Sequence, residues 1–210
     1  MSALANPVGG RALDPQDSAR ADLYALLSHL FLAAPSQALL DSVAAADDIA
    51  AEAPDSTLGR AWQRLQAAAV AVDTQALAQE FQDLFIGVGS GEVMPYGSWH
   101  VTGFLMEEPL ARLRDDLAQL GLSRLQSTPE PEDHIAALME TMRLLVAGSP
   151  DFAPTGYETQ KRFFARHLRP WYPRFVGQLC SAPSANFYRV AGELAQAFLD
   201  TEAACFEAYE

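Results

Sequence analysis

Two short clusters contain side chains that could act in catalysis or bind a metal. In the first, Ser98 and His100 place a hydroxyl and an imidazole two positions apart, the side chains of a nucleophile and its general base. No predicted strand precedes Ser98, and residues at this spacing meet only in special geometry, so the pattern argues against a hydrolase. In the second, Glu132, Asp133 and His134 could ligate a metal, but three successive helical residues point in different directions. We therefore expect neither an enzyme nor a metal site, and no cofactor of the chain's own.

The second cluster fits a binding role better than a catalytic one. A helix predicted from Glu132 has two acids in its first turn, where each stabilises the helix dipole by about 0.3–1 kcal/mol. That account does not extend to His134, because a cation is disfavoured at a helix N-terminus and the imidazole should be neutral. At 100° per residue, His134 lies at the margin of the apolar stripe that begins at Ile135, and Asp133 lies nearly opposite. We interpret this margin as the wall of a groove.

The first cluster lies within the longest interruption of the helical pattern, residues 84–105. This stretch is rich in glycine and aromatic residues and shows no helical period, which is typical of a functional loop held between helices. Its glycine run, Gly87–Gly91, follows a predicted helix and has no basic residue nearby, so a plain loop is favoured over a phosphate-binding loop. Within the interruption, Pro95–Trp99 is the segment that we expect to contribute to a binding surface.

The sequence around both clusters predicts helices. Capping residues, prolines in first turns and apolar positions three to four apart predict helices near residues 14–33, 36–46, 56–72, 73–85, 109–121, 132–147, 155–170, 171–179 and 185–209. Alternating strand patterns are absent. The predicted fold class is therefore all-α: a single compact domain of roughly nine or ten helices over residues 14–210, preceded by a flexible N-terminal tail, residues 1–13.

Composition narrows the classes of partner. The chain has 210 residues, half of them apolar, and its 27 acids against 14 bases give a net charge of −13. Such a surface repels phosphates, so we expect no nucleic-acid partner, and it attracts a cationic partner such as a basic peptide. The two cysteines are far apart, and no stretch is long and apolar enough for a signal peptide or a membrane span. We therefore expect a cytoplasmic protein without stable membrane insertion.

Four segments, in order along the chain, carry a resemblance to a known family. They are EFQDLFIG (80–87), the segment from PYGSWH to LAQLGL (95–122), EPEDHIAALMETM (130–142) with its Pro-x-Asp-His element, and FFARHLRPWYPRF (163–175) followed by FYRVAGELAQAFLDTEA (187–203). Together they make the chain similar to the TorD/DmsD family of redox-enzyme maturation chaperones. One departure is the glycine run, where many relatives have a proline-rich stretch.

The resemblance implies an all-helical, non-enzymatic chaperone with a molybdenum-containing oxidoreductase as its partner. Members of the family bind the twin-arginine signal peptide or the apo form of that catalytic subunit in the cytoplasm, assist cofactor insertion and control export. The alternative is a nucleotide- or pterin-binding accessory protein of molybdoenzyme assembly. The resemblance also implies a monomer or a domain-swapped dimer.

The implied peptide-binding positions fall on both clusters. The family's positions match Asp133, His134, Pro95, Tyr96, Ser98 and Trp99. The residue types add Phe104 as an apolar anchor and Glu132 as an acid that can pair with arginine. An exposed ion pair contributes only about 0–1 kcal/mol, so an apolar groove must supply most of the affinity. The main structural prediction is that the fold brings the two clusters together.

Overall fold

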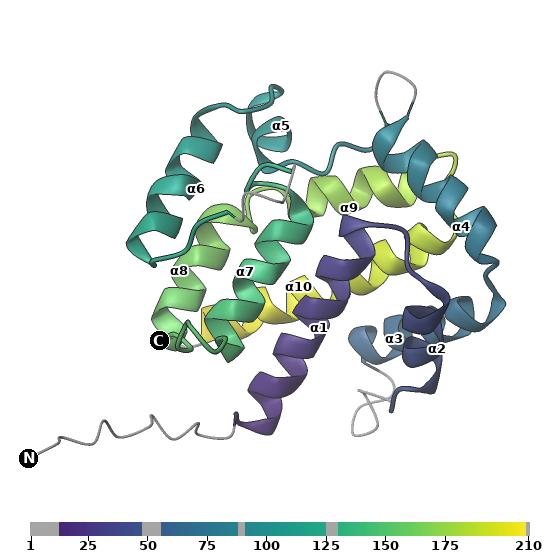
Figure 1. Cartoon of the computed structure of the whole chain (residues 1–210), viewed down its shortest axis with the longest axis horizontal. Helices are drawn as coiled ribbons and strands as arrows, with labels where there is room; N and C mark the ends of the chain where they lie inside the picture. The colour runs from purple at the N-terminus through teal and green to yellow at the C-terminus, as the bar shows by residue number, and fades with distance from the viewer. Residues whose placement is uncertain (1–12, 48–55, 88–90, 125–129, 209–210) are drawn as a thin grey trace, which may run out of the picture.

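The structure, a computed structural model, is built of helices (Figure 1). It describes residues 13–47, 56–87, 91–124 and 130–208, so nearly all of the predicted tail and part of the glycine run, residues 88–90, lie outside the described residues. The described helices are α1 (Pro15–Leu32), α2 (Gln37–Ala45), α3 (Thr57–Ala71), α4 (Thr74–Phe81), a π-helical turn η1 (Gln82–Ile86), α5 (Gly97–Thr102), α6 (Glu108–Gln119), α7 (Ile135–Ala147), α8 (Tyr157–His167), α9 (Tyr172–Ser181) and α10 (Phe187–Ala208). The all-α prediction is confirmed.

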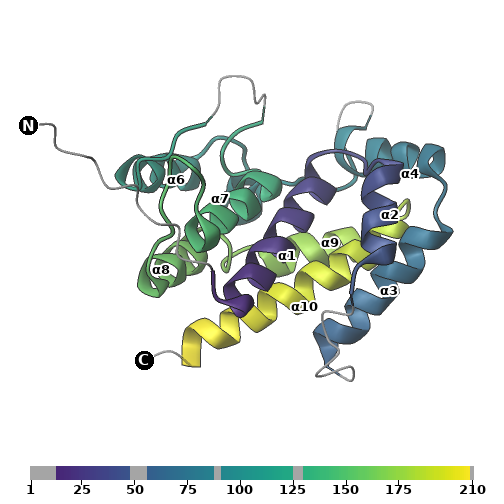
Figure 2. The same ribbon diagram turned by 60° about the horizontal axis from the view of Figure 1, so that its bottom comes forward.

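Among the described helices α10 is the longest, and it links the two ends of the molecule (Figures 1 and 2). Helices α2, α3 and α4 lie at one end, and α3 and α4 pack on α10. Helices α5 and α6 lie at the other end with α8, and α1 runs alongside α7 between the two ends. One continuous core fills the interior, and aromatic rings are prominent in it; Phe31 of α1 and Phe175 of α9 pack edge to face with ring centroids 5.4 Å apart. No helix in the described ranges is long and apolar enough to cross a bilayer.

Local capping explains why the first four helices begin where the sequence predicts. Each is preceded by a short polar residue whose side chain accepts a hydrogen bond from a main-chain amide of the first turn; these residues are Asp14, Ser36, Ser56 and Asp73. Pro15 occupies the first position of α1, where the missing amide costs nothing. The predicted starts of these helices are therefore confirmed.

Helix α10 is capped by a residue that lies far away in the sequence. The carboxylate of Glu80, near the end of α4, accepts hydrogen bonds from the main-chain amides of Asn186, Phe187 and Tyr188, at 2.8, 3.1 and 2.7 Å. These amides belong to the N-terminus of α10 and have no partner within the helix. Glu80 is 9 % exposed, so this contact ties α4 to α10 inside the molecule.

Two predictions about the interruption and its neighbour are wrong. Residues 84–105 are not irregular throughout, because η1 extends to Ile86 and α5 forms a short helix at Gly97–Thr102. Helix α7 begins at Ile135 and not at Glu132, so the acids of the second cluster precede the helix. For α5 and for the start of α7, contacts between distant segments, described below, outweigh the local pattern.

Candidate functional site

The two clusters meet at the N-terminus of α7. The amide of Gly97 donates to the carbonyl of Asp133 at 2.9 Å, and the amide of Ile135 donates to the carbonyl of Pro95 at 2.8 Å. This pairing is an isolated antiparallel bridge, and it holds the two segments side by side. The main structural prediction is confirmed: the fold joins the two clusters into one unit, which we call the junction, residues 95–98 and 133–135.

Asp133 fixes the position of helix α5. Its side chain is 4 % exposed, and Oδ2 accepts the main-chain amide of Ser98 at 2.8 Å. The N-cap position of α5, Tyr96, makes no side-chain capping bond, so the distant carboxylate supplies the cap. The predicted surface position of Asp133 is wrong, because the chain is extended here and turns the carboxylate inward before α7 begins. Asp133 therefore holds the N-terminus of α5 in place.

His134 caps helix α7 in its neutral form. Nδ1 of the buried imidazole accepts the main-chain amide of Ala136 at 3.1 Å, which requires an unprotonated nitrogen. Burial lowers the pKa of His134 to about 4, against the charges of Glu130 and Asp133, which act to raise it. The ring also packs edge to face on Tyr96 with centroids 5.2 Å apart. The neutral imidazole expected from the sequence agrees with this environment.

Ser98 and His100 are engaged separately. Ser98 is fully buried; its Oγ accepts the amide of Met106 at 3.2 Å, and its carbonyl accepts the hydroxyl of Thr102 at 2.9 Å. The His100 ring stacks on Trp171 with centroids 5.3 Å apart, and burial lowers the pKa of His100 below its ordinary value. Ser98 thus connects segments of the main chain, and its hydrogen bonds give it a structural role.

An exposed apolar surface lies on α5 and on the segment that follows it. It consists of five side chains that are 38–74 % exposed, which we call the apolar ridge: Trp99, Val101, Phe104, Leu105 and Met106. Gly103 ends α5 in the left-handed region, at φ 83°. Met106 also has a positive φ, 60°, which is uncommon for a residue with a side chain and costs about 1–2 kcal/mol. The bond to Ser98 helps to hold the ridge in this conformation.

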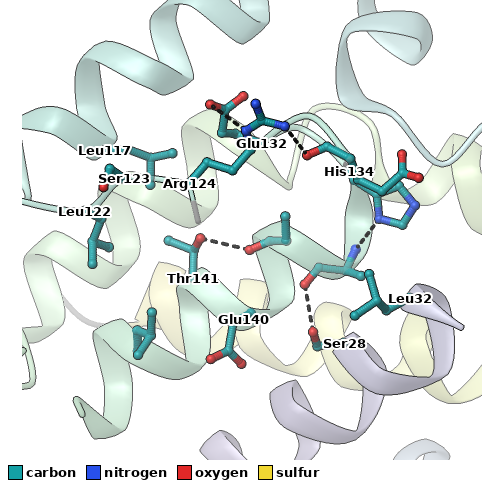
Figure 3. Close-up of a pocket in the computed structure, with 14 residues that line it drawn as sticks. Ser28, Leu32, Leu117, Leu122, Ser123, Arg124, Glu132, His134, Glu140 and Thr141 are labelled. Atoms are coloured by element: carbon teal, nitrogen blue, oxygen red, sulfur yellow. Dashed lines mark hydrogen bonds and ion pairs between the residues drawn. The ribbon is translucent and has the colours of Figure 1, made fainter. Parts of the chain in front are cut away.

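A cavity of about 280 Å³ lies on the other side of the junction, between α1, α6 and α7 (Figure 3). We call it the main cavity, and its lining residues are Ser28, Leu32, Leu117, Leu122, Ser123, Arg124, Glu130, Glu132, His134, Ala136, Ala137, Glu140, Thr141 and Leu144. Its apolar walls come from leucines of α1, α6, α7 and the loop after α6. Three glutamates and one arginine line it, and two arginines outside the lining, Arg114 and Arg143, pair with Glu132 and Glu140.

The glutamates of the main cavity are held by neighbours on their outer sides. Glu130 accepts the hydroxyl of Tyr96, and Glu132 accepts Nε and Nη2 of Arg114 at 3.0 and 2.9 Å. Burial alone would raise the pKa of Glu132, but the Arg114 hydrogen bond and the charges of Arg114 and Arg124 outweigh it, so this pKa lies below its ordinary value. Glu132 is therefore a fixed anion at neutral pH.

A second, smaller cavity of about 180 Å³ lies between α5, α6 and α8, and Ser98 and Asp133 line it. His134 lines the main cavity, so consecutive residues of the junction point into different cavities. Arg112 and Arg166 also line the small cavity, where each pairs with an acid of α6. Among the residues that the structure describes, no three His, Cys, Asp or Glu side chains gather closely enough to hold a metal.

The predicted site residues divide among these features. His134 and Glu132 line the main cavity, Tyr96 positions Glu130 there, and Trp99 and Phe104 stand on the apolar ridge. The remaining three are buried positioning residues of the junction: Pro95, Ser98 and Asp133.

Sequence reasoning missed other residues of the same surfaces. Glu140 and Arg124 of the main cavity and Leu105 and Met106 of the ridge were not predicted. Glu140 lies five residues beyond the start of α7 and carries no local signal that it faces a cavity. The ridge could have been predicted, because its apolar side chains are concentrated in a segment without helical period, just before a pair of glutamates.

Comparisons with known proteins agree on one family. The family model of the nitrate reductase delta subunit matches residues 51–177, more than half of the chain. The chaperone protein TorD of Vibrio cholerae is 27 % identical over 137 residues, which are 62 % of this chain and 62 % of that protein. The chaperone protein TorD of Vibrio atlanticus is 28 % identical over 200 residues, 87 % of this chain and 93 % of that protein.

Two further comparisons extend this result. The Tat proofreading chaperone DmsD of Salmonella typhi is 31 % identical over 125 residues, 58 % of each chain. A crystal structure described as a redox enzyme maturation protein from Archaeoglobus fulgidus has a TM-score of 0.56 at 22 % identity, and the match covers 87 % of this chain and 93 % of that one. The structural match concerns the fold alone.

Proposed function

Because the chain belongs to the nitrate reductase delta subunit family, which it shares with the TorD and DmsD chaperones, we propose that it is a maturation chaperone for a molybdenum-containing oxidoreductase. It binds the twin-arginine signal peptide of this client in the cytoplasm. Binding holds the client back from export until its cofactor has been inserted. The chain acts by recognition and not by catalysis.

The observation that carries this proposal is the main cavity. A twin-arginine peptide presents two guanidinium groups next to an apolar segment. The cavity offers leucine walls together with Glu130, Glu132 and Glu140, and arginine suits carboxylates because its planar fork can donate two parallel hydrogen bonds. The charges select and steer the peptide, and buried apolar contacts supply most of its affinity.

The apolar ridge is the second surface that supports the proposal. Its five exposed side chains stand within eight consecutive residues, and such a group on a soluble protein is typical of an interaction site. The ridge follows the junction directly in the chain. In the proposed complex, the apolar segment of the peptide contacts the ridge and its arginines reach the main cavity. Trp99, with the large ring common at energetic centres of interfaces, is the anchor we assign to it.

Calorimetry of the full chain with a synthetic twin-arginine peptide tests the proposal. We expect Glu132→Gln to weaken binding by about two- to five-fold, the size of one partly exposed ion pair, and Trp99→Ala to weaken it by about ten-fold or more, as for an interface anchor. Matched controls are Asp41→Asn on α2 and Val70→Ala on α3, both exposed and outside the cavity and the ridge. If the wild-type protein does not bind the peptide, the proposal is wrong.

The nucleotide or pterin alternative receives less support from the same cavity. A phosphate placed there would face three glutamates, and like charges at close range are unfavourable. Fluorescence titration with GTP distinguishes the two functions: the signal-peptide proposal expects no saturable change at micromolar ligand.

A further inference from the structure

The three glutamates of the main cavity have different neighbours, and two of them are already paired with arginines. The Glu132 carboxylate lies 2.9 Å from Nη2 of Arg114 and 3.9 Å from Nε of Arg124, which Figure 3 shows extended towards it. The Glu140 carboxylate accepts two hydrogen bonds from Arg143, at 2.8 and 2.7 Å. Each of these two carboxylates therefore has a positive charge beside it.

Glu130 is held by neutral groups instead. Its carboxylate accepts a hydrogen bond from the hydroxyl of Tyr96. Burial and this hydrogen bond raise the pKa of Tyr96, so the hydroxyl keeps its proton at neutral pH. His134, which packs on the same ring, is neutral as well. Within the described part of the chain, the ion pairs of the cavity's glutamates belong to Glu132 and Glu140.

This difference decides where the guanidinium group of a ligand gains most. Beside Glu132 or Glu140 it meets a resident arginine, and like charges at close range repel. Beside Glu130 it meets a phenol and an imidazole, both without charge. Arg124 reaches Glu130 at the main-chain carbonyl, where Nη1 donates at 3.4 Å, and forms an ion pair with Glu132. Glu130 is therefore the carboxylate of the cavity at which an added positive charge meets least repulsion.

The hydrogen bond with Tyr96 also fixes the direction of the Glu130 carboxylate. Each carboxylate oxygen can accept two hydrogen bonds, so the bond to Oε2 leaves both oxygens able to accept from a guanidinium group. A planar guanidinium group can then donate two parallel hydrogen bonds, whereas a lysine ammonium group lacks this fork. A carboxylate held in one direction by a neutral donor therefore favours arginine over lysine.

We propose that Glu130 is the residue of the main cavity that receives a guanidinium group of the client peptide, and that Tyr96 is the positioning residue that directs it. This inference rests on the proposed function and names the side chain that selects arginine at that site. Glu132 and Glu140 contribute less to the selection, because their charges are shared with arginines of this chain.

The test is calorimetry of the full chain with a synthetic twin-arginine peptide and two versions of it. In each version one of the two arginines is citrulline, which has nearly the same shape and no charge. The matched controls for Glu130→Gln are Glu132→Gln and Glu140→Gln, which line the same cavity and change the net charge equally. We expect Glu130→Gln to weaken binding of the Arg-Arg peptide about ten-fold or more, and each control about five-fold at most. With one citrulline peptide, Glu130→Gln should bind as wild type does, because the partner arginine is already absent.

Tyr96→Phe tests the positioning role. It keeps the ring that packs on His134 and removes only the hydroxyl. We expect about two- to five-fold weaker binding of the Arg-Arg peptide and no change with the citrulline peptide that is insensitive to Glu130→Gln, a difference that a purely structural role would not produce. The matched control is Tyr172→Phe on α9, which removes a hydroxyl that donates to Asp200 at 2.7 Å and should change neither affinity. Thermal unfolding verifies that each variant is folded.

Three outcomes would overturn the inference. Equal losses in Glu130→Gln and in both controls would mean that net charge alone is responsible. Equal effects of Glu130→Gln on all three peptides would mean that neither arginine contacts Glu130. If wild type binds the Arg-Arg peptide and Glu130→Gln binds it as tightly, the inference fails and the proposed function stands; if wild type binds none of the peptides, the proposed function fails and the inference fails with it.

Discussion

Replacing Asp133 separates a positioning role from direct contact with the peptide. The carboxylate is 4 % exposed and accepts the buried amide of Ser98 at 2.8 Å. Asp133→Ala leaves that amide without an acceptor, whereas Asp133→Asn keeps an oxygen of similar shape and loses only the charge. If Asp133 acts through α5, the alanine variant loses both stability and binding, and the asparagine variant retains most of both.

The expected magnitude follows from the single hydrogen bond. A buried amide left without an acceptor costs about 1–3 kcal/mol, and loss of charge from a retained hydrogen bond costs about 1 kcal/mol or less. For a domain of this size, each kcal/mol shifts the melting temperature by about 2–4 °C. Asp133→Ala should therefore melt about 2–12 °C below wild type, and Asp133→Asn within about 4 °C of it.

Urea unfolding and peptide calorimetry on the same preparations decide the question. Asp41→Ala on α2 is the exposed control and should stay within about 0.5 kcal/mol of wild type. The positioning argument is refuted if Asp133→Ala unfolds at the wild-type urea concentration. It is equally refuted if Asp133→Asn is stable but loses peptide binding as fully as Asp133→Ala, since the carboxylate would then contact the peptide itself.

Two further predictions concern stability. Glu80→Ala removes the acceptor of three amides of α10 and should cost about 3–5 kcal/mol in urea unfolding, while the exposed control Asp83→Ala should cost less than about 0.5 kcal/mol. His134 has a folded pKa of about 4 against 6.5 when unfolded, so the unfolded chain binds the extra proton between these values. Its contribution to stability is therefore complete above about pH 6.5 and is lost as the pH falls towards 4. His134→Asn, which can still cap α7, should flatten that part of the stability–pH curve.

The parts of the fold that follow from local physics could be predicted from the sequence. Asp14, Ser36, Ser56 and Asp73 cap the helices that they precede, because a short polar side chain reaches only the next two or three amides. Gly121, at φ 73°, lies just beyond α6, where glycine readily takes the left-handed conformation that ends a helix. Capping interactions span only a few residues, so they can be predicted without knowledge of the rest of the chain.

The parts that depend on distant contacts could not be predicted in the same way. Helix α5 has no capping residue of its own, and its cap, Asp133, lies 35 residues away in the sequence. The start of α7 moved to Ile135 because the chain before it is extended and pairs with the 95–97 segment. Arg124 could not be placed at a cavity that forms only when α1, α6 and α7 come together.

Ser98 links the junction to the apolar ridge, two of the features among which the predicted residues are divided. Its amide is held by Asp133 of the junction, and its hydroxyl holds the amide of Met106 on the apolar ridge. The ridge side chains are exposed, so packing does not offset the unfavourable positive φ of Met106, and bonds such as the one to Ser98 must do so. Holding apolar side chains in solvent costs free energy, and burial of these side chains under a partner offsets that cost. This favours the ridge as a surface that an apolar peptide segment covers.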